Sequence, residues 1–238
     1  MSFPRNNPFA AALVALALAL PLAAQANDKV SAAFEKAFRV KPEKVTRIEA
    51  IGLYEIVVGG DILYTDEKVT HLIQGSLIDV KTRTNLTEER LNKLLAINFA
   101  ELPLDLAVKQ VRGNGKATLV TFEDPNCGYC KRLARDLTNL EDTTIYTFLY
   151  PILSADSTEK SRAIWCAKDR ARAWNDWMID GKAPTAATCD APLEQLVELG
   201  QRYRVTGTPT IFFTDGSRAP GAIPLQQIRE RLAKIAGK

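Results

Sequence analysis

The sequence predicts an α+β protein with two domains, a small one followed by a larger one. Three observations lead to this fold class. Residues 45–66 alternate apolar and polar side chains, as half-buried strands do. Residues 87–102 change to the spacing of an amphipathic helix. Residues 117–124 are rich in apolar and β-branched side chains, and a Cys-x-x-Cys pair and a second helical pattern follow them directly.

Residues 1–26 have the pattern of a cleaved secretory signal peptide. Arg5 is their only charged residue, and the apolar run AAALVALALALPLAA follows it. The run is short for a membrane span, Pro21 interrupts it, and the small-x-small motif Ala24-Gln25-Ala26 comes next. A membrane anchor or a buried helix is the alternative. We expect cleavage after Ala26 and export to a compartment where disulfides persist.

The charge balance argues against nucleic acid as a partner. Loss of Arg5 leaves 30 of the 31 basic residues against 28 acidic ones, so the mature chain is close to neutral. It has no long basic stripe and no acidic tail, which also disfavours electrostatic binding to membranes.

Residues 27–85 are predicted to form the small N-terminal domain. A short amphipathic helix at 28–40 precedes two strands that meet at the turn Gly59-Gly60. Residues 70–80 suggest another strand pair, broken at Gly75. A core of this size is marginal alone, so we expect this domain to pair with a second copy in a homodimer.

Residues 86–109 are predicted to form a linker helix. Thr87 is a suitable N-cap, two glutamates follow it, and the helical pattern continues to Leu102 before Pro103 stops it. The domain boundary is therefore expected within residues 103–115.

Residues 110–238 are predicted to form the larger domain. The strand at 117–124 leads into the Cys pair and a helix, and another strand follows at 143–151. A long helical region at 156–203 interrupts before a last strand and a closing helix. The Cys pair therefore lies at a strand-to-helix junction.

Cys127 and Cys130 are candidates for a zinc site, a structural bridge or a redox pair. Structural zinc needs four Cys or His ligands, usually as two close pairs, and the remaining cysteines make no second such pair. A disulfide between these two cysteines would close a very short ring, which stabilises the folded protein only weakly. At a helix N-terminus, however, the first thiol is expected to have a pKa below its reference of about 8.5. We expect Cys127 to attack, Cys130 to resolve, and no metal or cofactor to take part.

The chain resembles a known family. TFEDPNCGYCKRL and the distant TGTPTIFF resemble a thioredoxin-like fold, in which Thr208-Pro209 is the cis-proline loop. The signal peptide, YTDEKVTHLIQGSLIDV, CGYC and AIWCAKD together are similar to the DsbC/DsbG family of bacterial periplasmic thiol:disulfide interchange proteins.

The resemblance implies a periplasmic V-shaped homodimer, joined through the N-terminal domains, that isomerises or reduces wrong disulfides in exported proteins. A membrane reductase of the DsbD type would keep Cys127 and Cys130 reduced. The substrate is expected to contact Thr208, Pro209 and Tyr129. A dithiol oxidase of the DsbA type and a periplasmic holdase are the alternatives, and chaperone activity is compatible with the isomerase.

Two departures from the thioredoxin pattern bear on the chemistry. The buried acid often found six residues before the first active-site cysteine is replaced by Thr121. Glu123 and Asp124 are nearer candidates for a proton-handling carboxylate, but we expect them to be acids solvated at the surface. No histidine lies between the cysteines, in contrast to oxidases of the DsbA type, which fits a less oxidising enzyme.

Cys166 and Cys189 are expected to form a structural disulfide. The loop that they would close has more than twenty residues, for which the chain-entropy estimate is about 3 kcal/mol. A second redox pair and a set of zinc ligands are the alternatives.

Overall fold

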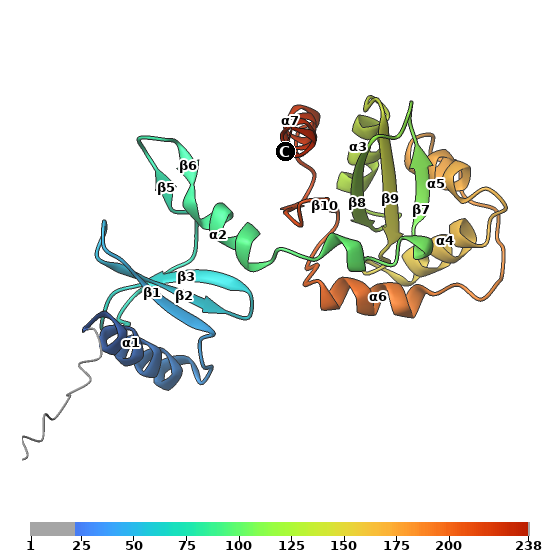
Figure 1. Ribbon diagram of the computed structural model, residues 1–238. Coiled ribbons are helices and arrows are strands. Elements are labelled where there is room, and N and C mark those ends of the chain that lie inside the picture. The colour runs from blue at the N-terminus through green and yellow to red at the C-terminus, as the bar shows by residue number, and fades with distance from the viewer. Residues whose placement is uncertain (1–21, 238) are drawn as a thin grey trace, which may run out of the picture. The chain divides into compact units, whose positions relative to one another are not determined.

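The computed structural model describes residues 22–237, which divide into two compact units, one ending at Gly75 and the other beginning at Ser76 (Figure 1). Most of the predicted signal peptide, residues 1–21, lies outside the described residues. Residues 22–26 are the beginning of helix α1.

The first unit is an antiparallel sheet with one helix packed on it. The sheet has the order β1-β2-β3-β4. Its core consists of Val30 and Phe34 from the helix against Tyr54 and Ile56 from β2. The elements are α1 (Leu22–Phe38), β1 (Lys44–Ile48), β2 (Leu53–Val58), β3 (Asp61–Thr65) and β4 (Leu72–Ile73).

The glycine pair makes the predicted hairpin. Gly59 and Gly60 both have positive φ, 61° and 85°, and join β2 to β3, with Val58 opposite Asp61. Positive φ at both central residues gives the twist that a two-residue hairpin needs. The strand pair expected within residues 70–80 does not form, because β4 pairs with β3 in the first unit. The following β5 (Ile78–Asp79) pairs instead with β6 (Thr84–Asn85) in the second unit.

The linker helix begins at residue 86, as predicted, but it is shorter than the sequence prediction. Residues 76–85, which the sequence grouped with the N-terminal domain, belong to the second unit. Helix α2 (Leu86–Leu94) is capped by Asn85 rather than Thr87 and does not reach Leu102. The chain leaves the helix because the Ile97 N–H donates to the carbonyl of Gly216, 3.1 Å away. Two short 3₁₀ turns follow, Phe99–Glu101 and Leu104–Leu106.

The second unit is built on a mixed sheet of order β11-β10-β8-β9-β7. The central strands β8 and β9 are parallel, and the other neighbours are antiparallel. The strands are β7 (Val108–Val111), β8 (Ala117–Glu123), β9 (Thr143–Leu149), β10 (Thr210–Phe213) and β11 (Arg218–Pro220). Its helices are α3 (Gly128–Leu137), α4 (Ala155–Trp165), α5 (Arg170–Met178), α6 (Leu193–Arg202) and α7 (Leu225–Ala236).

Side chains alternate between two cores on the faces of this sheet. Leu119 of β8 and Ile211 of β10 lie in one cluster with α7, and Val120 and Phe122 of β8 lie in the other with α6. Helix α3 contributes to both clusters. Because the central strand β8 is covered on both faces, even its last residue is removed from solvent.

Candidate active site

The two motif cysteines lie between the end of β8 and the first turn of α3. Cys127 is the N-cap residue of α3, and its Sγ accepts a hydrogen bond from the backbone N–H of Cys130 at 3.4 Å. Both are free thiols, Cys127 with 7% of its surface exposed and Cys130 with none. A negative charge on the Cys127 sulfur would therefore face a backbone N–H group and the positive end of the helix dipole.

The loop before β10 lies against Cys127. The peptide bond between Thr208 and Pro209 is cis. The Cys127 thiol donates to the Thr208 carbonyl oxygen at 3.3 Å, although the two residues are 81 positions apart. This approach arises because β10 pairs with β8 and brings the start of one strand beside the end of the other.

The residues next to the cysteines point in different directions. Tyr129, between them, is 67% exposed. The Lys131 ammonium lies 3.8 Å from the ring centroid of Trp177, and Arg132 faces Asp136 at 4.0 Å. Trp177 was not predicted from the sequence to lie here, because it comes from the helical region at 156–203, distant in sequence from the cysteines.

Glu123 and Asp124 are buried, so the expectation that they are surface acids is wrong. They have 1% and 0% of their surface exposed. The physical reason is that β8 is an interior strand covered on both faces as far as its last residue. The sequence carried a signal for this burial, since the strand pattern at 117–124 is apolar on both faces.

The Glu123 carboxyl group holds its proton unusually tightly. Burial raises its pKa from 4.5 to about 8, and a hydrogen bond with Thr121 offsets the shift only in part. Among the described residues its Oε2 atom has no hydrogen-bond partner. Burial also raises the pKa of the Cys130 thiol, and the nearby charges of Glu123 and Cys127 raise it further. The carboxyl group and the inner thiol therefore form an electrostatically coupled pair.

Asp124 fixes the turn that leads into Cys127. Its Oδ1 accepts from the Asn126 N–H at 2.8 Å and from the Ser157 hydroxyl at 2.8 Å. Its Oδ2 accepts from the backbone N–H groups of Ile152 and Leu153 at 2.9 and 3.0 Å. All four partners are donors, so the buried carboxylate joins the active-site turn to the loop before α4.

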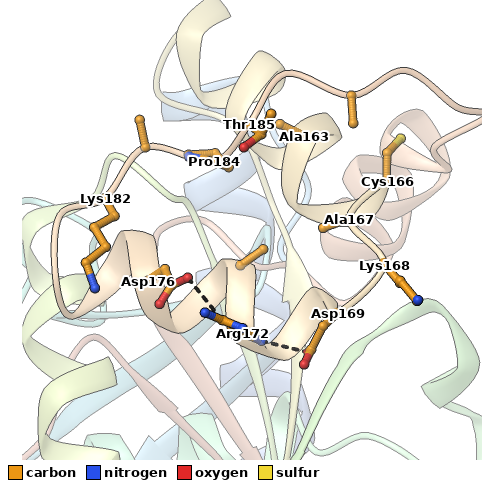
Figure 2. Close-up of a pocket in the computed structure, with 13 residues that line it drawn as sticks. Ala163, Cys166, Ala167, Lys168, Asp169, Arg172, Asp176, Lys182, Pro184 and Thr185 are labelled. Carbon is orange, nitrogen blue, oxygen red and sulfur yellow. Dashed lines mark hydrogen bonds and ion pairs between the residues drawn. The ribbon is translucent and has the colours of Figure 1, made fainter.

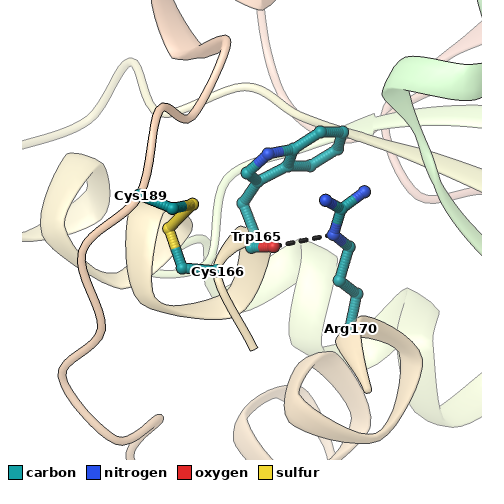
Figure 3. The surroundings of a disulfide bond; sticks show 4 residues. All are labelled: Trp165, Cys166, Arg170 and Cys189. Atoms are coloured by element: carbon teal, nitrogen blue, oxygen red, sulfur yellow. Dashed lines mark hydrogen bonds between the residues drawn. A yellow bond between two sulfur atoms is a disulfide. The ribbon is translucent and has the colours of Figure 1, made fainter. Parts of the chain in front are cut away.

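Cys166 and Cys189 are joined by a disulfide, with Cα atoms 5.6 Å apart (Figure 3). Cys166 is the C-cap of α4, whereas Cys189 is exposed on a segment without regular structure before α6. Beside the bridge, Arg170 lies over the Trp165 ring, 3.5 Å from its centroid, and donates to the Trp165 carbonyl oxygen at 2.7 Å. The bridge ties the long loop after α5 to the end of α4.

A hollow of about 410 Å³ lies beside this disulfide, where α5 faces the segment that follows it (Figure 2). Its walls carry charges of both signs, and Arg172 contacts Asp169 and Asp176. Neither the motif cysteines nor the cis-proline loop line it. The hollow therefore lies apart from Cys127 and Cys130.

Within residues 22–237, no group of three or more His, Cys, Asp or Glu side chains is arranged to hold a metal ion. No helix in this described part of the chain is long and apolar enough to cross a membrane.

Comparison with protein families gives two matches that cover most of the chain. Residues 21–88 match the disulfide bond isomerase protein N-terminal domain. Residues 104–236 match the thioredoxin-like domain.

Comparison with individual proteins points the same way. The chain is 52% identical to the probable thiol:disulfide interchange protein DsbC of Bordetella parapertussis over 86% of this chain and 74% of that protein. It is 28% identical to the thiol:disulfide interchange protein DsbC of Escherichia coli K12, over 88% and 89% of the two chains. A crystal structure of a disulfide interchange protein from Neisseria gonorrhoeae superposes with a TM-score of 0.54 and 41% identity, covering 56% of this chain and 97% of that one.

Proposed function

The chain belongs to the DsbC family of thiol:disulfide interchange proteins, and from this premise we propose that it is a periplasmic disulfide isomerase and reductase that acts through Cys127 and Cys130. One observation carries the assignment of roles. The Cys127 sulfur is the N-cap of α3, within hydrogen-bonding distance of the Cys130 N–H and of the cis-proline loop. The outer thiol is thus placed to meet a substrate strand, and the inner thiol to resolve the mixed disulfide.

The reaction begins when the Cys127 thiolate attacks one sulfur of a client disulfide. The bond formed is a mixed disulfide between protein and client, and the second client sulfur leaves as a thiolate. Another client thiolate can then attack the client sulfur of the mixed disulfide, which leaves a shuffled client bond and frees Cys127. Alternatively, the Cys130 thiolate attacks Cys127, which releases a reduced client and leaves the protein oxidised.

Resolution requires the proton of Cys130 to leave a buried site. Glu123 is the group placed to accept it, because its charge and the Cys130 thiol are coupled. A carboxyl group with a pKa of about 8 is present in both forms near neutral pH, so its ionised fraction can accept the proton in resolution and its protonated form can return it in reduction.

The Thr208 and Pro209 backbone would hold the client strand beside Cys127, with Tyr129 as an exposed aromatic contact. The reduced state needed for attack would be restored by a membrane reductase of the DsbD type. Clients would be exported proteins with wrong disulfides.

A homodimer formed through the N-terminal unit completes the proposal. Strand β4 ends the sheet, and its Leu72 and Ile73 side chains are 37% and 51% exposed. Exposed apolar edge strands are usually paired or protected, and a second copy would cover this one. The match of residues 21–88 to the disulfide bond isomerase N-terminal domain supports the same assembly.

Refolding of a scrambled multi-disulfide protein tests the function. We expect Cys127→Ser to abolish rescue, and Cys130→Ser to retain part of it while accumulating mixed disulfides with the client. The comparison assay is oxidation of the fully reduced client. A protein that oxidises this client quickly but cannot rescue the scrambled one is an oxidase. A protein that prevents aggregation equally well with Cys127→Ser and rescues nothing is a holdase.

A further inference from the structure

Trp177 on α5 reaches the turn that precedes Cys127. Its indole Nε1–H donates to the Pro125 carbonyl oxygen at 2.6 Å, although the two residues are 52 positions apart. Pro125 lies between the buried carboxylate of Asp124 and the N-cap cysteine, so this bond fixes the backbone just before the attacking sulfur.

The same indole ring also contacts the residue that follows Cys130. The Lys131 ammonium lies 3.8 Å from the Trp177 ring centroid, and the Lys160 ammonium of α4 lies 4.8 Å from it. Burial lowers the pKa of Lys131, and the charge of Lys160 lowers it further, as expected of two cations that share one aromatic ring. Trp177 is therefore in contact with the chain on both sides of the Cys-x-x-Cys motif.

A second set of contacts holds the same turn from α4. The Asn126 side-chain amide donates to Asp156 Oδ2 at 2.7 Å and to the Ser157 hydroxyl at 3.1 Å. Lys160 in turn forms an ion pair with Asp156. The turn at Pro125 and Asn126 is thus fastened to α4 and α5 by two polar links that share Lys160.

We propose that Trp177 is a positioning residue for the redox pair, one that keeps the Cys127 sulfur aimed at the Cys130 N–H through its bond to Pro125. The proposal rests on the proposed function, since it assigns Trp177 a part in the reaction of that pair. The role of Trp177 goes beyond the proposed function, because it places a determinant of the redox equilibrium in the helical insertion.

The physical argument concerns the two redox states. A thiolate on Cys127 gains from the N–H of Cys130 and the helix N-terminus only while the turn holds the sulfur there. A looser turn weakens that interaction in the dithiol state, whereas the disulfide state carries no negative charge to lose. Loss of the Trp177 bond should therefore shift the equilibrium toward the disulfide.

The test compares Trp177→Phe with Trp165→Phe. Both substitutions remove one indole N–H from the same insertion. Trp177→Phe also weakens the contacts of the ring with Lys131 and Lys160, and Trp165→Phe weakens the contact with Arg170 beside the disulfide of Cys166. The full-length protein is equilibrated with reduced and oxidised glutathione, and its dithiol fraction is measured by alkylation and mass spectrometry. Two glutathione thiols reduce one Cys127–Cys130 disulfide and yield one glutathione disulfide. The ratio of protein dithiol to protein disulfide at known glutathione concentrations therefore gives the equilibrium constant.

We expect Trp177→Phe to shift this constant about threefold or more toward the protein disulfide, because the hydrogen bond from the Cys130 N–H to the Cys127 sulfur is weakened in the dithiol state. Trp165→Phe should leave the equilibrium constant within about 1.5-fold of the wild-type value, a change smaller than the one expected for Trp177→Phe. An unchanged constant in Trp177→Phe, or an equal shift in Trp165→Phe, overturns the proposal. Failure of the function itself would appear separately, as a wild-type protein that does not rescue scrambled clients.

A measurement on the wild-type protein covers the case in which Trp177→Phe does not fold. The indole N–H signal of Trp177 in a ¹⁵N spectrum should exchange slowly with solvent and should move when Cys127 and Cys130 are oxidised. A signal that exchanges at the rate of an open indole, or that stays in place on oxidation, overturns the proposal as well.

Discussion

Replacement of Glu123 by glutamine removes a buried carboxyl group while keeping the size of the side chain. The pKa of this group is 4.5 when it is free in solution and about 8 in the folded protein, because burial disfavours the charged form. The folded state therefore retains a proton that the unfolded state has already lost over this pH range. The difference makes stability depend on pH.

The sign and size of this pH dependence follow from the difference in bound protons between the folded and unfolded states. Below pH 4.5 both states hold the proton, and the group has no effect. Between pH 4.5 and about 8 only the folded state holds it, so the free energy of unfolding falls by about 1.4 kcal/mol per pH unit. By pH 7 the wild-type protein has lost about 3 kcal/mol relative to pH 4.5 through this carboxyl group, and above pH 8 the loss is complete. Glu123→Gln cannot titrate and lacks this slope.

The assay is urea unfolding at several pH values between 5 and 8, with Cys127 and Cys130 kept as thiols under argon. The slope is the readout, because the glutamine amide adds only a pH-independent cost of its own. Glu141→Gln, at an exposed glutamate, is the matched control and should keep the wild-type slope. Equal slopes in wild type and Glu123→Gln would refute the reasoning that Glu123 is buried with its proton.

Three further predictions follow from the structure. Replacing Cys166 and Cys189 by alanine opens a link between residues 23 positions apart and should lower the free energy of unfolding by about 3 kcal/mol in urea titrations, and an unchanged value would contradict a structural role. Asp124→Asn places an amide N–H group opposite buried hydrogen-bond donors, so it should lower the free energy of unfolding by about 2 kcal/mol or more and slow disulfide exchange. A variant as stable as wild type would refute the stabilising role of the Asp124 hydrogen bonds. The mature protein should sediment at twice the mass of one chain, and Ile73→Lys on the exposed edge should shift it to the monomer, so a monomeric wild type would rule the dimer out.

The order of elements and the position of the Cys-x-x-Cys pair could be predicted from the sequence alone. A buried strand, a Cys-x-x-Cys pair and a helical pattern are contiguous, so their local signals do not depend on distant parts of the chain. The glycine pair at 59 and 60 likewise specified the hairpin between β2 and β3, because a two-residue turn needs positive φ at both positions. These features were set by neighbours in the sequence.

The end of the linker helix was decided by a distant contact. The pattern of apolar residues continues to Leu102, but the helix ends at Leu94, because Ile97 bonds to Gly216 and Arg218 donates to the Leu95 carbonyl at 2.6 Å. Helical periodicity cannot report a competing hydrogen bond from another part of the chain.

The chemical character of the site depended on tertiary packing in the same way. Glu123 ends a strand beside a polar turn, a place where acids are usually solvated, yet the sheet and its two layers of helices close around it and raise its pKa to about 8. Trp177 meets Pro125 only because α5 folds back against α3. The sequence by itself therefore determined that two thiols lie at a strand-to-helix junction. The packed structure alone decided which carboxyl group and which indole surround them, because burial and contacts between distant segments arise only when the chain is folded.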